Sequence, residues 1–286
     1  MPFMENQVLG YKSPLYGRQT CQFKVKLFGY HECAEVLPGF SAEDRITLYG
    51  ICGGILDYVS RINNGIPVKQ NAESLFFNPS RRHFEEPSSL LKQKLRSPQT
   101  YNGIIAAIAS SISRLNEIAS KAGIETSQCS NMLATLVALE MVKEEHPIRL
   151  SFVKPEGKTG GKVETYMEPV FEECAVQFLW REMAKKQYGF KDTGRWRGSN
   201  PREKRQEEID FIAKDSQEGA IFGKCKWRAS RTGSDTLDDL VRKSELFPYF
   251  EKKRYMLFSK SDFSSELKKV VAQREDVVLV GLGDMF

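Results

Sequence analysis

The stretch EEIDFIAK at residues 207–214, followed by DSQEG at 215–219 and AIFGKCKW at 220–227, decides the fold of this chain. The outer segments are apolar and the middle one is polar, which predicts two strands joined by a turn. Side chains two apart in a strand share a face, so Lys224 and Lys226 point the same way. The hairpin therefore brings Asp210 on the first strand beside two lysines on the second.

The segments around this hairpin predict a mixed α/β fold. Helices are expected over residues 171–180, 236–246 and 264–273, and further strands over 194–198, 254–259 and 277–282. The strand at 254–259 is largely apolar without alternation, which is typical of a strand buried in a mixed sheet. Helix, three strands, helix and strand is the order of the restriction-endonuclease-like core.

Residues 98–167 predict a winged helix-turn-helix. Three helices are expected, at 101–110, at 115–122 before Gly123, and after a cap at Thr126 or Ser127. The segments 148–153 and 163–167 are expected to pair as the wing. The nucleic-acid contacts expected here are Ser127, Gln128, Asn131, Lys158 and Lys162. Because the third helix has no Lys or Arg, it is expected to bind DNA weakly by itself. The alternative is a winged helix used only for packing or protein contact.

Residues 1–97 show one clear strand, at 21–28, and several short helices, one of them starting after Ser41. This part does not resemble a closed domain. Its motifs are YGR at 16–18, SAEDRITLYGICGGI at 41–55, FEEP at 84–87 and PQTYNGI at 98–104. Together they resemble the archaeal-type DEXX-box ATPase family, an AAA-like group, and match the end of its ATPase domain.

A second set of motifs resembles the domain that follows the ATPase in that family, often catalogued as one of unknown function. These motifs are FEE at 171–173, GRW at 194–196, EID at 208–210, CKW at 225–227 and RKSEL at 242–246. The resemblance implies a lid remnant at 1–97, the winged helix at 98–167 and a restriction-endonuclease-like domain at 168–286. An aromatic-rich helical segment that the family has between the last two parts is missing.

The nucleotide-binding half of the ATPase is expected to precede Met1 and is absent from this sequence. A P-loop needs a Gly five residues before its Gly-Lys-Thr, so that backbone amides can cradle phosphates. The Gly-Lys-Thr here starts at Gly157, and the position five before it is Phe152. We therefore expect a flexible hairpin tip, no ATPase activity and no nucleotide cofactor.

The resemblance to the nuclease-like domain implies a metal site on the opening hairpin. Asp210 and a Glu at position 224 would be the ligands and Lys226 the charge stabiliser, while Glu172 or Glu173 would orient a water or the metal. Position 224 is Lys instead. At an effective dielectric constant near 20, unit charges about 4 Å apart interact by about 4 kcal/mol. Because Lys224 repels a divalent ion, we expect metal-dependent cleavage to be lost or severely reduced, and Mg²⁺ only if the site is active.

Other interpretations of these residues stay open. Asp210 and Lys226 can be plain polar positions of an alternating hairpin, and Glu172 and Glu173 can be solvated helix residues. A cluster of basic residues near the site can follow a phosphate backbone or form a solvated loop: Arg195, Arg197, Arg202, Lys204 and Arg205.

The composition sets broad limits. The net charge is +5 with a pI near 8.8, which permits an anionic partner without requiring one. Six scattered cysteines without a Cys-x-x-Cys pair favour reduced thiols in a cytoplasm. The sequence has no 18-residue apolar run and no secretory signal, so no membrane association is expected. The oligomeric state does not follow from the sequence.

The function expected is that of a truncated ATPase-family protein with a degenerate nuclease-like domain, associated with nucleic acid or with other proteins. DNA is the expected nucleic acid, and the ATPase remnant is the expected protein contact. One alternative is an active metal-dependent DNA nuclease that uses Asp210 and Lys226, with Glu208 or Glu173 as a substitute carboxylate. Another is a non-functional gene remnant.

Overall fold

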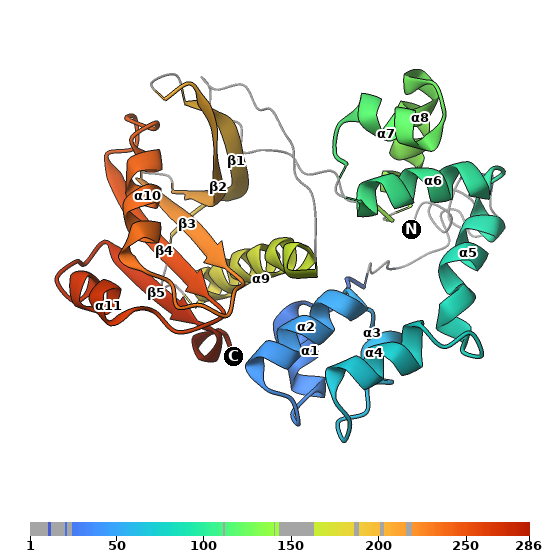
Figure 1. Cartoon of the computed structure of the whole chain (residues 1–286), viewed down its shortest axis with the longest axis horizontal. Helices are drawn as coiled ribbons and strands as arrows, with labels where there is room; N and C mark the ends of the chain where they lie inside the picture. The colour runs from blue at the N-terminus through green and yellow to red at the C-terminus, as the bar shows by residue number, and fades with distance from the viewer. Residues whose placement is uncertain are drawn as a thin grey trace. The chain divides into compact units, whose positions relative to one another are not determined.

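The computed structural model describes residues 11–12, 21, 25–110, 112–139, 141–142, 163–185, 189–200, 203–215 and 219–286. The fold is mixed α/β, with an N-terminal helical region followed by a five-stranded mixed sheet and its helices (Figure 1). This confirms the predicted fold class. The chain divides into two compact units, one holding α5 to α8 and the other holding α1 to α4, α9 and the sheet.

The unit with the sheet contains the C-terminal end of the chain and the helices between Leu27 and Asn78. Its helices are α1 (Tyr30–Val36), α2 (Ala42–Cys52), α3 (Leu56–Val59), α4 (Val68–Phe76), α9 (Val163–Ala184), α10 (Ser234–Ser244), α11 (Ser265–Val271) and the 3₁₀ helix η2 (Leu282–Met285). Its strands are β1 (Asp192–Asn200), β2 (Arg205–Lys214), β3 (Gly219–Lys226), β4 (Lys252–Ser259) and β5 (Val277–Gly281). The strands and helices predicted between 171 and 282 are therefore confirmed, most of them within a few residues, although α9 begins eight residues before the predicted 171.

The strands lie in the order of the sequence, β1-β2-β3-β4-β5. The first three are antiparallel neighbours, and β3, β4 and β5 are parallel. Parallel neighbours need a crossover, which α10 and α11 supply between β3, β4 and β5. The paired register of β2 and β3 ends at Phe211 and Gly223. Asp210 and Lys224 are the next residues, where the ladder has stopped.

The two faces of the sheet bury separate cores. Phe211 and Phe258 belong to the core that also holds Phe171 of α9. Phe222 and Leu257 belong to the core that also holds residues of α10 and α11. The alternation along β3 and β4 follows from the two-residue repeat of a strand. The sheet is thus covered on both faces, which explains why β4 is buried from Tyr255 onward.

Helices α1 and α2 share the first core with α9, which the sequence analysis did not foresee. The Oε1 atom of Gln177 on α9 accepts a hydrogen bond of 3.0 Å from the Tyr30 backbone N–H. Its Nε2 atom donates to the Tyr49 hydroxyl over 2.8 Å. The Tyr30 hydroxyl donates to the Met285 carbonyl over 2.9 Å. The domain boundaries expected at residues 97 and 167 stay predictions.

The other compact unit contains α5 (Arg82–Lys94), α6 (Pro98–Ala109), α7 (Leu115–Ala122) and α8 (Thr126–Ala138). These confirm the three helices expected between 101 and 138, but the residue at the N-cap of α8 is Glu125 and not Thr126 or Ser127. Gly123 ends α7 in the left-handed region at a φ of 69°, a conformation that Gly adopts without the strain of a Cβ atom. The unit has its own buried core, which includes Leu91, Ile104, Ile118 and Leu136.

Two expected strands are wrong. Residues 163–167 form the first turns of α9 instead of a wing strand, because Met167 is the first of four buried residues at helical spacing, with Phe171, Cys174 and Phe178. The segment 148–153 lies outside the described residues. Residues 25–28 of the strand expected at 21–28 are irregular, and the Phe28 N–H donates to the Gly54 carbonyl over 3.0 Å instead of to a neighbouring strand.

No helix in the described ranges is both long enough and apolar enough to cross a membrane.

Candidate functional site

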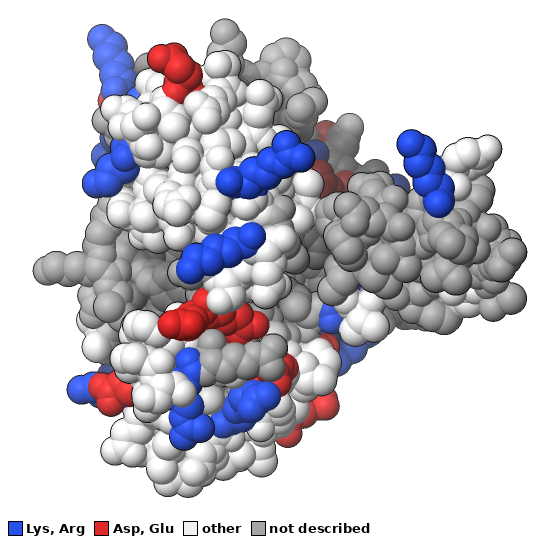
Figure 2. Space-filling view, turned by 90° about the vertical axis from the view of Figure 1, so that its right-hand side faces the viewer, with Lys and Arg blue, Asp and Glu red and all other residues white. Residues whose placement is uncertain are grey.

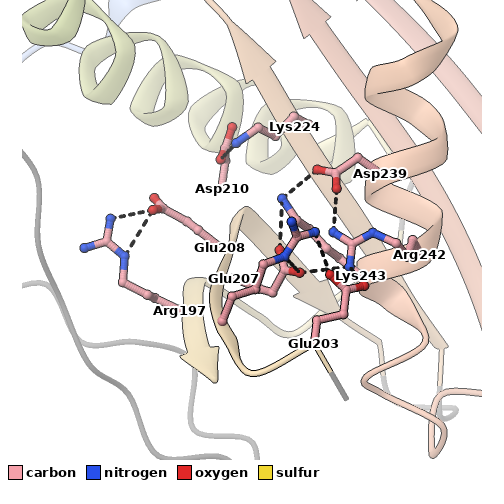
Figure 3. A network of polar contacts seen from close by, with 10 residues as sticks. Arg197, Glu203, Glu207, Glu208, Asp210, Lys224, Asp239, Arg242 and Lys243 are labelled. Carbon is pink, nitrogen blue, oxygen red and sulfur yellow. Dashed lines mark hydrogen bonds and ion pairs between the residues drawn. The ribbon is translucent and has the colours of Figure 1, made fainter. Parts of the chain in front are cut away.

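The centre of the candidate site is an ion pair between Asp210 and Lys224. Lys224 Nζ lies 2.5 Å from Asp210 Oδ1, and the other oxygen, Oδ2, accepts the Cys225 backbone N–H over 2.7 Å. The Asp210 side chain is 2% exposed and that of Lys224 is 20% exposed. Figure 3 shows Lys224 reaching directly across to Asp210. Both oxygens of the carboxylate are therefore already bonded within the chain.

Nearby acidic groups stabilise the positive charge of Lys224. Burial alone lowers the pKa of an ammonium, but the attraction and hydrogen bond of Asp210 oppose it, as do the charges of Glu172 and Glu208. The net result is that the pKa of Lys224 is raised above its ordinary value. Lys224 is thus a fixed cation at the position where the nuclease-like pattern has a carboxylate.

Glu172 on α9 joins this site from the helix that covers the sheet. Its carboxylate is paired with the guanidinium of Arg195 on β1. Burial and then the negative charge of Asp210 raise the pKa of Glu172 to about 8, against the opposing effect of Arg195. The structure thereby brings together Asp210, Lys224 and Glu172, three of the residues predicted for the site.

Glu173 faces a different part of the molecule. Its Oε1 atom accepts hydrogen bonds of 3.3 Å from the Tyr49 hydroxyl and from Gln177 Nε2. These contacts tie α9 to α2 within the shared core. Adjacent residues of a helix point about 100° apart, so Glu172 can reach the sheet while Glu173 reaches the N-terminal helices.

Lys226 shares a face with Lys224 but has none of its contacts. Within the described part of the chain, no hydrogen bond or ion pair involves its ammonium. Burial, followed by repulsion from Lys224, lowers the pKa of Lys226, and Asp210 opposes this. The two lysines of the hairpin are therefore chemically unlike, one paired and one without a partner.

Three of the basic residues predicted around the site are paired with acids, whereas Lys204 is exposed and has no ion pair among the described residues. Arg197 Nε donates to Glu208 Oε2 over 3.1 Å, and Arg195 Nε lies 3.9 Å from Glu208 Oε1. Arg205 Nε donates to Glu207 Oε1 over 3.0 Å. Arg202 lies outside the described residues. Three of the predicted phosphate contacts thus have their charge balanced within the chain.

A further network, which the sequence analysis missed, joins α10 to β2 (Figure 3). Glu207 is buried, and its carboxylate lies 2.8 Å from Arg242 Nη1 and 3.6 Å from Lys243 Nζ. Asp239 pairs with the same two cations, at 2.6 Å from each. Burial raises the pKa of Glu207, but the bonds from Arg242 and Arg205 outweigh this and lower it. The RKSEL motif at 242–246 contains both cations, but its sequence alone does not predict that they pair with Glu207 on β2.

The residues described near Asp210 do not fit a divalent cation. The three carboxylates there belong to Asp210, Glu172 and Glu208, and each is already paired with a cation: Lys224, Arg195 and Arg197. A hard cation such as Mg²⁺ needs oxygen ligands that are free to bind it. Throughout the described ranges, no group of three His, Cys, Asp or Glu side chains is arranged to hold a metal ion.

The predicted contacts of the helical unit are partly described. Ser127, Gln128 and Asn131 are exposed on α8, while Lys158 and Lys162 lie outside the described residues. On the face shown in Figure 2, the described Lys and Arg side chains are interspersed with Asp and Glu and separated by uncharged residues. That face offers no continuous basic surface among the residues described.

Comparisons with known proteins match part of this chain to a family of unknown function. Residues 153–236 match the profile of DUF234, described as archaea bacterial proteins of unknown function. The uncharacterized protein MJECL04 of Methanocaldococcus jannaschii is 28% identical over 88% of this chain and 64% of its own length. The chain thus spans less than two thirds of that relative. The crystal structure of protein VC1899 from Vibrio cholerae is similar over 91% of this chain and 55% of its own, with 11% identity and a TM-score of 0.33.

Proposed function

We propose that the unit with the sheet is a restriction-endonuclease-like domain in which the Lys224 side chain replaces the metal ion. The observation that carries this proposal is the ion pair of Lys224 with Asp210. A lysine ammonium brings one positive charge to the position, where a divalent ion would bring two. It also supplies no site for an activated water, which a metal ion provides in hydrolysis. The domain would therefore bind a nucleic acid without cutting it.

The order of the elements supports the nuclease-like assignment. Helix α9 precedes three antiparallel strands, and α10 then crosses to the parallel strand β4. Asp210 lies where β2 and β3 separate, with Glu172 beside it from α9. The exposed polar residues of α8 and the net charge of +5 support nucleic acid as the partner.

We also infer that the chain corresponds to the C-terminal portion of an ATPase-like protein, in accord with the motifs at 16–18, 41–55 and 84–87. Protein partners would then be bound through residues 1–97, the part that resembles the end of the ATPase domain.

Cleavage assays test the loss of the metal. Purified protein incubated with labelled DNA and Mg²⁺ or Mn²⁺ is expected to leave the DNA intact. Lys224→Glu restores a carboxylate and is expected to bind Mn²⁺ in a calorimetric titration, whereas the unmodified protein does not. Lys252→Glu changes an exposed lysine at the start of β4 by the same charge and is the control. Metal-dependent cleavage by the unmodified protein that disappears in Asp210→Ala would overturn the proposal.

Binding is tested separately by fluorescence anisotropy with labelled DNA over a salt series. We expect binding at low salt that weakens as salt increases, because phosphate contacts release counterions. A protein that fails to bind DNA even at low salt would exclude the nucleic-acid part of the proposal and leave the metal-free site in place.

A further inference from the structure

Strand β5 is an outer strand of the sheet, and its outer backbone groups have no partner in the described part of the chain (Figure 1). The Tyr255 N–H of β4 donates to the Asp276 carbonyl over 2.8 Å, and Tyr255 pairs with Val277. In a parallel pair, this pattern directs the backbone groups of the even-numbered residues of β5 toward β4. The N–H and C=O groups of Val277 and Leu279 therefore point away from the sheet, where no described residue bonds to them.

The other edge of the sheet, β1, has protection that β5 lacks. Natural sheets shield an edge with charged side chains, proline or a bulge, because a row of unpaired backbone groups is a template for another strand. Strand β1 carries Arg195 and Arg197, and its register is irregular between Gly194 and Trp196. Strand β5 has the sequence VVLVG, with no charged residue or proline, and its register with β4 is regular throughout. The free edge of β5 is therefore suited to pairing with another strand.

The middle of this edge is accessible. Val278 and Leu279 are half-buried, and Val278 packs against the core of α9 while Leu279 packs against the core of α10 and α11. Their side chains thus lie on opposite faces of the sheet, which leaves the backbone between them at its border. The described elements that contact β5 most are β4, α11 and η2. Of these, only β4 pairs with β5, and it does so on the inner side.

We propose that two copies of this chain pair through β5 in antiparallel orientation, so that their sheets join across a two-fold axis. Such an axis places the same segment of each copy against itself. With Val278 opposite the partner's Val278, Val277 exchanges two hydrogen bonds with the partner's Leu279, and the reverse pair does the same. This alignment satisfies the N–H and C=O groups of Val277 and Leu279 in both copies. An alignment centred on Leu279 would need the Gly281 N–H, which Asp284 Oδ2 already accepts over 2.8 Å.

Sedimentation velocity of the full chain over a series of concentrations measures the oligomeric state. We expect a species of twice the 32.6 kDa mass of one chain to grow as the concentration increases. Leu279→Pro removes the outward N–H and leaves the bonds to β4, since proline is tolerated on an edge strand where its nitrogen faces outward. It is expected to weaken dimerisation about a hundredfold, a factor of about ten for each of the two bonds lost per dimer. Leu279→Ala loses the same side chain but keeps the N–H, so it is the matched control and is expected to form the dimer.

A cross-linking experiment tests the alignment and does not depend on the proline variant being folded. Residues opposite each other in a non-hydrogen-bonded antiparallel pair have Cα atoms about 4.5 Å apart, within the range of a disulfide. Val278→Cys is made in a chain with Cys21→Ser, because Cys21 is exposed. With oxidised glutathione as the oxidant, we expect a disulfide-linked dimer on a non-reducing gel. Val270→Cys in the same background places a thiol at an exposed position of α11 and is expected to stay monomeric.

Two results would overturn the inference. The first is an unmodified chain that sediments as a monomer at every concentration. The second is a dimer in which Val278→Cys forms no more cross-link than Val270→Cys, because the two copies then meet through another surface. Circular dichroism of Leu279→Pro shows whether it is folded, and a folded variant that dimerises as tightly as Leu279→Ala also counts against the inference. Neither DNA nor a metal ion enters these measurements, so the proposed function is tested separately.

Discussion

At the scale of single residues, Asp210 and Lys224 depend on each other. Removing one member of a buried ion pair leaves an uncompensated charge and costs about 3–5 kcal/mol, whereas apolar replacement of both is often nearly neutral. We expect Asp210→Ala to lower the free energy of unfolding by about this amount. Lys224→Met combined with Asp210→Ala is expected to recover much of the loss. Urea unfolding of Asp210→Ala, Lys224→Met and the double variant measures this, and a double variant as unstable as the sum of the two single ones would contradict it.

The raised pKa of Glu172 predicts that the stability of the folded chain depends on pH. Its pKa is raised to about 8 in the folded chain, first by burial, whereas an unfolded Glu has a pKa near 4.3. Between these values the folded chain keeps a proton that the unfolded chain has lost, so this group makes stability fall as pH rises from about 5 to 8. Glu172→Gln cannot ionise. The unmodified chain should therefore lose stability relative to Glu172→Gln across this range, measured as urea midpoints at each pH. Parallel curves would disprove the assignment.

The residue contacts were only partly predictable. The two-residue repeat of the hairpin was enough to place Asp210 beside Lys224. It did not reveal that the Cys225 N–H takes the second carboxylate oxygen, because that depends on how the strands separate beyond Phe211 and Gly223. It also could not separate Glu172 from Glu173, since the rotation of α9 about its axis is fixed by packing against the sheet and α2.

At the scale of elements, the packing of β2 against β3 requires a residue without a side chain at position 223. A Cβ atom there would lie 1.9 Å from Phe211 Cζ, so the ring occupies that space. Gly223→Ala forces the Phe211 ring to move and is expected to destabilise the fold by about 1–3 kcal/mol, as overpacking does. Gly283→Ala has nothing within 4 Å of its added Cβ atom and is the control. Thermal unfolding compares the two, and equal melting temperatures would refute the prediction.

The elements themselves were largely predictable because local signals agreed with their tertiary setting. Ser41 and Ser264 cap α2 and α11 through their hydroxyls, accepting the N–H of Asp44 and of Leu267. The failures came at the strand expected at 21–28, whose described residues 25–28 are irregular, and at 163–167, a short segment that fits a strand in isolation. The helical spacing of Met167 with the buried residues after it decides the outcome, and Pro169 lies inside the helix despite its usual cost.

At the scale of the molecule, Gln177 is the main polar contact between the N-terminal helices and α9. It bonds the Tyr30 N–H, the Tyr49 hydroxyl and the Glu173 carboxylate. Gln177→Ala leaves the Tyr30 donor without its acceptor, and we expect a loss of about 1–3 kcal/mol. Gln70→Ala, at an exposed position on α4, is the control. Hydrogen exchange should show faster opening of α1 and α2 in the first variant, and unchanged exchange there would contradict the shared core.

The shared core also determines when the N-terminal helices can finish folding during synthesis of the chain. Helices α1 and α2 leave the ribosome before the elements that complete their core, because α9 follows α2 by roughly 110 residues and β5 and η2 follow it by roughly 225 or more. At a synthesis rate of about 5–20 residues per second, the early helices wait on the order of ten seconds or more with apolar surface uncovered. Helices α5 to α8 form a separate unit and emerge during this wait. Chaperones that hold nascent chains would therefore meet the first helices while their final partners are still being translated.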